Sequence, residues 1–300
     1  MAKRIIAMVV VLVVAATAMY TGIRLVATAA STAHATAVID TFDTGYTSAR
    51  GMCTLSGDGR VLFCKDCDRQ LPCASTTKIL TAITAIENCG HLDIPIEIDP
   101  KSVGVEGTSI YLQKGEKLTI RELLYGLMLR SGNDAATAIA LHVGKCAGKN
   151  FVELMNETAI KAGAVNSNFK NPHGLDQEGH YTTAKDLALI SAYAMKNKTF
   201  CEIVSTKQTK ISGMAYPRVI KNKNRLLNGM ENCVGIKTGF TKKAGRCYVG
   251  AIREDDLTVI CCVLNCGPMF EEAAELMDDG MDILQREKAA GMWFNQNNVS

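Results

Sequence analysis

The sequence lacks an excess of either charge. Its 33 Lys and Arg residues nearly balance 30 Asp and Glu residues, which leaves a formal net charge of +3. A strongly basic chain would point to nucleic acid or to an anionic surface. The near balance by itself neither indicates nor excludes such a partner, and we predict no nucleic acid among the partners.

Long apolar runs are also rare. One uncharged run extends from Ile5 to Ile23 after Lys3 and Arg4, and nothing later is long and apolar enough to cross a bilayer. An alanine-rich segment with small-residue cleavage candidates follows. Residues 1–37 are therefore predicted to be a signal peptide or an uncleaved signal anchor. Either way we expect the rest of the chain outside the cytoplasm, secreted or anchored to the outer face of the cytoplasmic membrane.

Paired metal-ligand motifs are missing, although the chain has 12 cysteines. Cys64-Lys65-Asp66-Cys67 has the spacing of half a zinc site, but no second Cys or His pair lies nearby at typical spacing. We therefore predict no metal and no cofactor.

Other cysteines have structural interpretations. Cys53 and Cys64 flank a hairpin turn signal at residues 56–59 and could lie on neighbouring strands. Cys261 and Cys262 are adjacent on a predicted strand and so point to opposite faces, and at least one is expected to be a buried thiol. Exported proteins form disulfides, but the pairing is not fixed by this spacing.

The first motif with chemical meaning is Ser75-Thr76-Thr77-Lys78. Apolar residues at positions 79, 80, 83 and 86 follow helical spacing, so Ser75 is predicted to open a helix. There, unpaired backbone N–H groups favour negative charge developing on a substrate oxygen. Lys78 lies on the same face and could take the serine proton if burial or a cation such as Lys237 lowers its pKa. Alone, Ser75 could equally be a simple N-cap.

The same spacing recurs at Ser167 and Lys170. That segment runs into the turn-like Asn171-Pro172-His173-Gly174, where no helix would hold the pair in register. We predict that this second pair is not catalytic.

The second motif is Ser131-Gly132-Asn133. It follows a predicted helix over 119–130 and precedes an alanine-rich helix to Leu141. Ser131 and Asn133 thus lie on a tight link where short polar side chains could point into a cleft. By itself the segment also fits an ordinary helix–helix turn.

The third motif, Lys237-Thr238-Gly239-Phe240, ends a predicted strand. Two further strands, 246–252 and 257–264, complete a predicted antiparallel sheet. An edge strand offers backbone groups to an extended peptide, and Lys and Thr can hold a terminal carboxylate. Gly239 would let the substrate approach the backbone closely. The alternative is an exposed strand end that carries a charge.

These three motifs in this order are the signature of penicillin-binding proteins and class A β-lactamases. From about Ala49 to about Leu284 the chain resembles the low-molecular-mass penicillin-binding proteins, the serine-type D-alanyl-D-alanine carboxypeptidases. Further matching segments are Gly107-Thr108-Ser109-Ile110-Tyr111-Leu112, Leu129 to Ala136, Asn171 to Asp176 and His180 to Ala188.

The resemblance implies an α/β (α+β) fold of the β-lactamase/transpeptidase-like type, with an antiparallel sheet packed by helices plus a helical lobe. Residues 38–290 would form one catalytic domain, ending in a helix from about Met269, and residues 291–300 a tail. Relatives often carry a second β-rich domain, and we expect none here.

The resemblance also implies a two-step acyl transfer on the peptidoglycan stem peptide, inhibited by β-lactams. Ser75 would be the nucleophile and Lys78 its base, while Ser131 relays a proton to the leaving amine. The substrate-binding residues would be Asn133, Lys237, Thr238, Gly239 and Phe240. The N–H groups of Ser75 and Phe240 would form the oxyanion hole. Many relatives carry His where this chain has Phe240, a change that keeps the backbone donor.

Other functions have weaker support. A β-lactamase needs a Glu-assisted water, and residues 166–173 contain no acidic side chain. A non-catalytic wall-binding module would lose a motif residue, and all are present. D,D-endopeptidase activity on cross-links stays open, because the same type of bond is cut. His173 and His180 are expected to be structural, and the basic stretch 218–225 to be a solvated hairpin that could also meet anionic wall polymer.

Overall fold

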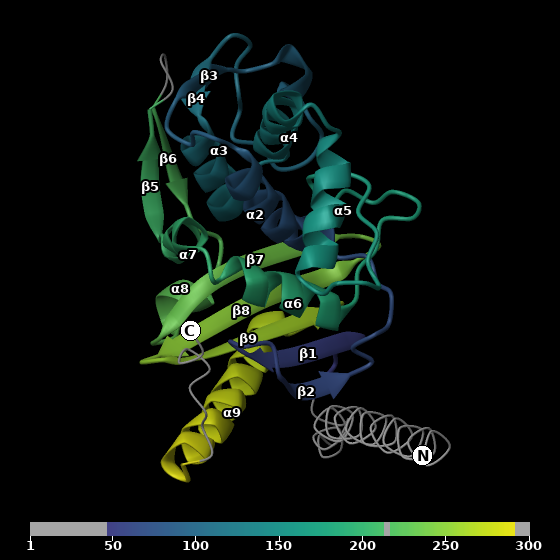
Figure 1. The fold of residues 1–300 in the computed structure, drawn as a ribbon, viewed down its shortest axis with the longest axis vertical. Coiled ribbons are helices and arrows are strands. Elements are labelled where there is room, and N and C mark those ends of the chain that lie inside the picture. The colour runs from purple at the N-terminus through teal and green to yellow at the C-terminus, as the bar shows by residue number, and fades with distance from the viewer. Residues whose placement is uncertain (1–46, 213–216, 292–300) are drawn as a thin grey trace, which may run out of the picture. The chain divides into compact units, whose positions relative to one another are not determined.

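A five-stranded antiparallel sheet, in the order β2-β1-β9-β8-β7, forms one half of the described protein (Figure 1). The structure is a computed structural model that describes residues 47–212 and 217–291, all within one compact unit. The predictions for residues 1–37 and for positions 292–300 fall outside this part. The strands are β1 (Gly51–Ser56), β2 (Val61–Lys65), β7 (Cys233–Thr241), β8 (Gly245–Glu254) and β9 (Leu257–Leu264).

The two faces of this sheet are both buried. One face packs against the helices α6 (Ala184–Ala194) and α7 (Lys198–Ser205). The other face packs against the long helix α9 (Met269–Ala289). Cys262 belongs to the first core and Cys261 to the second, and both side chains are fully buried. The prediction that these neighbours point to opposite faces is confirmed, because side chains alternate along a strand.

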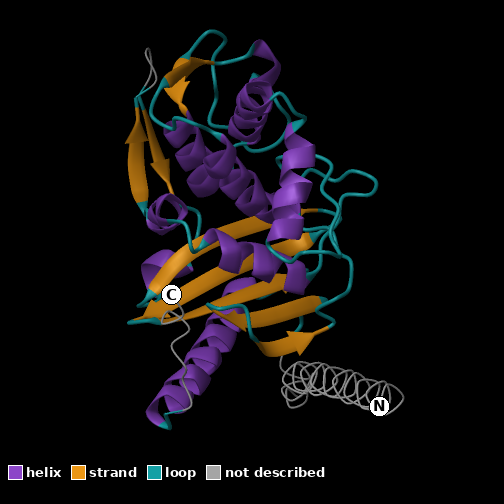
Figure 2. Ribbon diagram, in the orientation of Figure 1, coloured by secondary structure: helices purple, strands orange, loops and turns teal. Residues whose placement is uncertain are grey.

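Helices fill the other half of the described protein (Figure 2). Apart from α9 they are α2 (Lys78–Asn88), α3 (Ile120–Tyr125), α4 (Asn133–Ala147), α5 (Phe151–Lys161), α6 (Ala184–Ala194), α7 (Lys198–Ser205) and α8 (Leu226–Gly229). Short 3-10 turns lie at η1 (Ala74–Thr77) and η2 (Pro100–Ser102), and η3 (Gly126–Arg130) is a π-helical turn. Two small sheets of two antiparallel strands flank these helices. They are β3 (Pro95–Glu97) with β4 (Lys117–Thr119), and β5 (Gln208–Ile211) with β6 (Arg218–Lys221).

The start of α2 differs from the prediction. The α-helix begins at Lys78, and Ser75 lies in the preceding 3-10 turn. The turn is tight because both the N–H and the hydroxyl of Thr76 donate to the Cys73 carbonyl, while Ala74 adopts a left-handed φ of 49°. Ser75 and Lys78 therefore share a junction between two kinds of helix.

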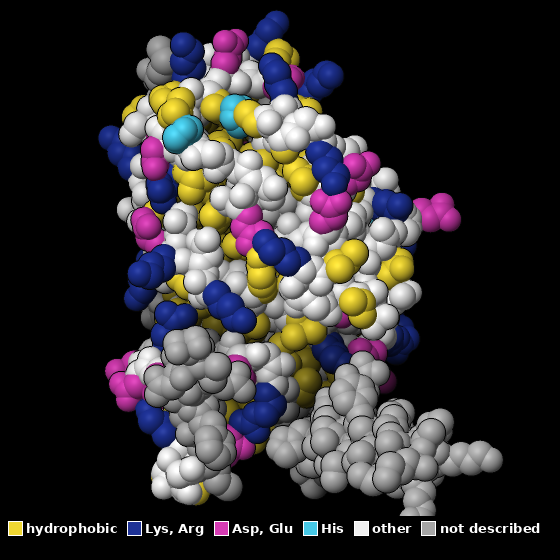
Figure 3. Space-filling view, in the orientation of Figure 1, with side chains coloured by type: hydrophobic (Ala, Val, Ile, Leu, Met, Phe, Trp, Pro, Cys, Tyr) yellow, Lys and Arg dark blue, Asp and Glu magenta, His cyan; other side chains and the backbone are white. Residues whose placement is uncertain are grey.

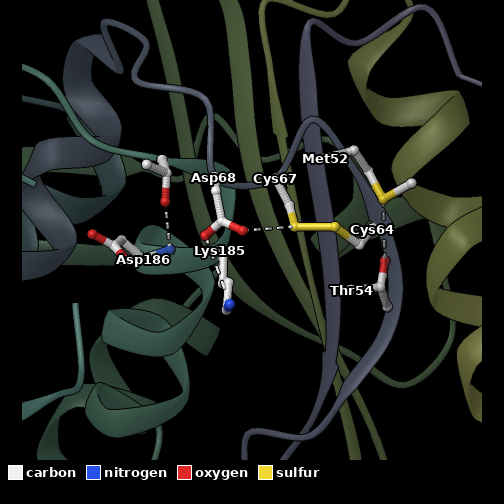
Figure 4. Close-up of a disulfide and its surroundings, with 8 residues drawn as sticks. Met52, Thr54, Cys64, Cys67, Asp68, Lys185 and Asp186 are labelled. Carbon is white, nitrogen blue, oxygen red and sulfur yellow. Dashed lines mark hydrogen bonds and ion pairs between the residues drawn. A yellow bond between two sulfur atoms is a disulfide. The ribbon is translucent and has the colours of Figure 1, made fainter. Parts of the chain in front are cut away.

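The cysteines at the β1–β2 hairpin form a disulfide that the sequence did not specify. Cys53 faces Cys64 across the two strands, as predicted, but Cys64 is bonded to Cys67 (Figure 4). No group of His, Cys, Asp or Glu side chains within the described ranges could hold a metal ion. Nor does any helix there have the length and hydropathy to span a membrane.

Charges of both signs are interspersed on the face shown in Figure 3. One ion pair is mostly buried: Arg218 of β6 contacts both carboxylate oxygens of Glu116, at 2.6 and 2.8 Å. The prediction of a solvated basic hairpin is therefore wrong for Arg218, whose partner lies far away in the sequence.

Candidate active site

Lys78 lies at the centre of the candidate site and is fully buried. Its Nζ lies 2.9 Å from Ser75 Oγ, 2.7 Å from Asn133 Oδ1 and 2.5 Å from the His173 carbonyl oxygen. The first two motifs thus meet at one amine, together with a backbone carbonyl that no sequence motif marks.

The three oxygen atoms around this amine fit an ammonium group that donates to all of them or a neutral amine that donates to two. The Asn133 amide is oriented by its Nδ2, which donates to the Glu106 carbonyl at 2.6 Å, so its oxygen faces Lys78. That oxygen and the His173 carbonyl accept only. A neutral amine has two hydrogens for these acceptors, and its lone pair then faces the hydroxyl of Ser75. The geometry is that of a base beside its nucleophile.

The electrostatic surroundings favour this neutral form. Burial, followed by the cations Lys237 and Lys223, lowers the pKa of Lys78 well below its ordinary value. The expectation that Lys237 acts in this way agrees with the structure, although burial is the larger cause. Lys223 belongs to the basic stretch that the sequence suggested would be solvated.

Ser131 and Asn133 are held by the turn between η3 and α4. Ser131 is buried and has a left-handed φ of 71°, which is uncommon for a residue other than glycine. Asn133 N–H donates to the Thr108 carbonyl at 2.7 Å. Next to it, the buried carboxylate of Asp134 accepts from the Ser109 hydroxyl and from the N–H groups of Ile110 and Leu112.

The turn is therefore not an ordinary helix–helix link, because it also anchors the loop over residues 108–112. The sequence missed Asp134 as a positioning residue. The matching segment from Gly107 to Leu112 was the available signal, but nothing showed that the two segments touch.

Strand β7 forms the opposite wall, at the edge of the sheet, as predicted. Lys237 is buried, donates from Nζ to the Thr238 carbonyl at 2.9 Å, and has its pKa lowered to about 7 by burial and by Lys223. Thr238 is half-buried, and the Phe240 side chain is 65% exposed. A lysine that contacts only a backbone oxygen in the described residues keeps hydrogens for an anionic substrate group.

Gly239 brings this strand against the nucleophile turn. A Cβ at position 239 would lie 3.0 Å from the backbone nitrogens of Ser75 and Thr76. The third motif thus contacts the first through backbone atoms, and a larger residue would push the strand away from Ser75.

The loop over residues 171–176 closes the site from a third side. A Cβ at Gly174 would lie 1.9 Å from the Ala74 carbonyl oxygen, and Gly174 has a left-handed φ of 84°, so only glycine fits. Asp176 accepts from the Thr241 hydroxyl at 3.0 Å, which ties this loop to the end of β7. The backbone of His173, rather than its side chain, reaches Lys78.

Behind the nucleophile, His180 contacts the same turn. Its Nε2 lies 3.0 Å from Thr77 Oγ1, and its Nδ1 accepts from the Lys170 N–H at 3.1 Å. With Nδ1 as an acceptor, the neutral ring carries its hydrogen on Nε2 and donates it to Thr77. Burial lowers the pKa of His180 to about 4. The structural role expected for this residue is consistent with these contacts.

The second Ser-x-x-Lys segment has no such arrangement. The hydroxyl of Ser167 donates to Asp186 at 2.7 Å, and Lys170 is exposed. The two side chains do not contact each other in the described structure.

Comparisons with known proteins agree with this geometry. The model of a peptidase family described as D-alanyl-D-alanine carboxypeptidase matches residues 54–267. The chain belongs to this family. It is a serine-type D-Ala-D-Ala carboxypeptidase by that membership, as the motifs predicted.

Individual relatives extend the family match over most of the chain. A D-alanyl-D-alanine carboxypeptidase of Streptomyces sp. is 35% identical over 266 residues, 83% of this chain and 90% of the relative. The carboxypeptidase DacF of Bacillus subtilis is 30% identical over 73% of this chain, which spans only 57% of that relative.

Solved structures confirm the predicted fold class. The crystal structure of a Streptomyces DD-transpeptidase matches with a TM-score of 0.73 and 31% identity, over 81% of this chain and all of the other. A penicillin-binding protein homologue of Mycobacterium tuberculosis matches with a TM-score of 0.74 and 28% identity, over 83% and 95% of the two chains.

Proposed function

We propose that this carboxypeptidase removes the terminal D-alanine from peptidoglycan stem pentapeptides through an acyl-enzyme on Ser75. The contact between Lys78 Nζ and Ser75 Oγ, with the other two partners of the amine being obligate acceptors, carries the proposal. β-Lactams would inhibit the enzyme by acylating the same oxygen.

In the first step, Lys78 takes the proton of Ser75 as the serine oxygen attacks the carbonyl carbon of the D-Ala-D-Ala bond. The N–H groups of Ser75 and Phe240 receive the negative charge that develops on the carbonyl oxygen. Ser131 relays the proton now held by Lys78 to the leaving nitrogen, and the C–N bond breaks. D-Alanine leaves, and an ester remains on Ser75.

In the second step, water attacks the ester as the neutral Lys78 takes one of its protons, and Lys78 returns that proton to Ser75 Oγ as the ester C–O bond breaks. Lys237 and Thr238 bind the terminal carboxylate of the substrate, and Asn133 holds an amide on the acyl side. Gly239 supports these roles, because it allows β7 to lie against the backbone of Ser75.

Transfer of the acyl group to an amine is a second candidate outcome. A structure similar to this one is named a DD-transpeptidase. Both reactions share the acyl-enzyme, so they differ only in whether water or an amine attacks it. D,D-endopeptidase activity, which our sequence interpretation left open, also shares this intermediate.

A β-lactamase-like role has less support. Within the described structure, the only acidic side chain that accepts hydrogen bonds from the segment 166–173 is Asp186, which accepts from Asn166 N–H and Ser167 Oγ, both at 2.7 Å. A carboxylate held by these donors is poorly disposed to activate a water.

The location of the enzyme follows from its substrate. Family members act on peptidoglycan, which lies outside the cytoplasm, so we propose an extracytoplasmic enzyme that residues 1–37 export or anchor to the membrane. Cell fractionation with and without these residues would test the anchor.

Labelled penicillin tests the nucleophile. Peptide mass spectrometry should place the adduct on Ser75, and Ser75→Ala should abolish both the adduct and the release of D-alanine from a pentapeptide. An adduct on Ser131 or Ser167 would contradict the assignment. Adding a glycine-type amine during turnover would measure how the acyl-enzyme divides between water and acceptor.

A further inference from the structure

A pocket of about 330 Å³ lies between β6, the end of η3 and the loop over residues 109–111. It is lined by Ser109, Ile110, Tyr111, Arg130 and the strand Arg218–Lys221. Its volume is in the range of small-ligand sites. None of the catalytic or substrate-binding residues assigned above lines it, so its role is separate from the acyl transfer itself.

Sequence neighbours, hydrogen bonds and charge interactions connect the pocket to the candidate active site. Arg130 directly precedes Ser131, and Ser109 is bonded to the same Asp134 that follows Asn133. Lys223 N–H, two residues after the pocket strand, donates to the Leu129 carbonyl at 3.1 Å. The charge on Arg130 acts on Lys223, and that on Lys223 acts on both Lys237 and Lys78.

Two cations at this pocket have no anionic partner. Arg218 is paired with Glu116, whereas neither Arg130 nor Lys221 makes an ion pair or a side-chain hydrogen bond with any residue the structure describes. Both are exposed and therefore available to a ligand. The pocket thus offers two free positive charges beside one that is neutralised.

The rest of the lining is largely apolar. Tyr111 is 70% exposed and Val219 58% exposed, so both offer side-chain surface to a ligand. Tyr111 also has a left-handed φ of 62°, and its carbonyl accepts from Arg218 at 3.0 Å. A strained residue held in place at a pocket wall is typical of binding sites.

The order of the cations from Lys237 through Lys223 to Arg130 indicates which part of the substrate would face the pocket. Lys237 and Thr238 are proposed to bind the carboxylate of the C-terminal residue, and the cations continue from there through Lys223 to Arg130. We therefore place the pocket next to the residue that leaves in the reaction, and its volume exceeds what the methyl group of D-alanine would fill.

We propose that this pocket binds the side chain of the leaving D-residue and selects one that carries a carboxylate. This inference rests on the proposed function and deepens it. A leaving group larger than D-alanine is also what an endopeptidase must accept, so the pocket bears on the choice that the sequence left open.

Tripeptides that differ only in their C-terminal D-residue test the pocket. Diacetyl-L-Lys-D-Ala-D-Glu and its D-Gln counterpart differ by one charge and have nearly the same shape. For the unaltered enzyme, kcat/KM should be about two- to twentyfold higher for D-Glu than for D-Gln, because exposed ion pairs contribute modestly. A C-terminal D-Lys should be the poorest of the three, and the D-Glu preference should shrink as salt is added.

Arg130→Gln and Lys221→Gln should each reduce the D-Glu to D-Gln ratio by about two- to fivefold. Lys101→Gln is the matched control, because Lys101 is exposed on η2 and does not line the pocket. It should leave the ratio unchanged. The two variants lie in different secondary-structure elements, so the test can still be made if one variant fails to fold.

Three outcomes would overturn the inference. These are equal rates for D-Glu and D-Gln, a preference that neither variant alters, and variants that lose binding to an anionic wall polymer while keeping the preference. The D-Ala tripeptide and penicillin labelling of Ser75 are measured in parallel. Failure of both would refute the proposed function, whereas activity on D-Ala without a D-Glu preference refutes only the pocket.

Discussion

The two walls of the active site hold their lysines in different ways. Lys78, on the helical wall, contacts three oxygen atoms from three separate segments, and two of these atoms accept only. Lys237, on the sheet wall, contacts one acceptor, the carbonyl of its own neighbour Thr238. Both amines are buried, and both have lowered pKa values.

This difference shows how one residue type serves two purposes. All the hydrogens of a neutral Lys78 are used by the protein, which leaves only its lone pair for chemistry. Lys237 has spare hydrogens and is suited to bind an anion, for which it must keep its charge. The number of fixed acceptors, rather than burial, separates the proposed base from the proposed binding cation.

The largest effect should come from the helical wall. Lys78→Arg replaces the amine with a guanidinium group that does not lose its proton at working pH. Acylation by penicillin should slow by about 10²–10⁴-fold, as is typical when a general base is lost. Stopped-flow acylation measures this, with circular dichroism to verify folding. Near-normal acylation would remove Lys78 from the mechanism.

A smaller effect is expected on the sheet wall. Thr238→Val removes one hydroxyl donor and nearly keeps the shape. Since a hydrogen bond to a charged group contributes roughly 1.5–3 kcal/mol, kcat/KM for a D-Ala-D-Ala peptide should fall about ten- to a hundredfold.

The control is the same peptide amidated at its C-terminus. It should be a poor substrate already and should lose much less on substitution. Equal losses for acid and amide would mean that Thr238 does not bind the carboxylate.

The pH profile sharpens the comparison between the lysines. Lys237 has a pKa of about 7 and must be charged to bind a carboxylate, so kcat/KM should fall above pH 7, by about tenfold per pH unit at the limit. Lys78 must be neutral, so its titration gives the acid limb of the profile. Lys237→Arg, which stays charged, should lose the alkaline limb. An unchanged alkaline limb in that variant would assign it to another group.

The smallest effect concerns stability behind the helical wall. The pKa of His180 is about 4 in the folded protein and near 6.5 when unfolded, so the unfolded state binds more protons between these values. Stability should therefore fall as pH drops from 6.5 to 4, by on the order of 2 kcal/mol for this residue. Urea unfolding of His180→Gln should show a smaller loss over that window, and an identical loss would exclude His180 as its source.

Much of this site could be predicted from residue type and spacing. The motifs identified the side chains that meet, and the alternation of apolar residues identified β7, β8 and β9 and placed Cys261 and Cys262 on opposite faces. That Gly239 lets the substrate approach the backbone stays a prediction. The structure shows a different close neighbour of Gly239, the backbone of Ser75.

What the sequence missed has physical causes. The His173 and Glu106 carbonyls that orient Lys78 and Asn133 are backbone groups, which no residue type reveals. The Cys64–Cys67 bond competes with a cross-strand alternative that the spacing fits equally well. The pairing of Arg218 with Glu116 depends on a tertiary contact, which a count of local charges cannot show.

The cysteine distribution makes the protein well suited to site-selective labelling. Burial raises the pKa of Cys247 and of Cys261 to about 12, and a thiol without a thiolate form reacts slowly with alkylating reagents. Cys146 alone among the free cysteines of the described residues is exposed. It lies near the end of α4, the helix that begins at Asn133. A fluorophore attached there would lie at the opposite end of α4 from Asn133.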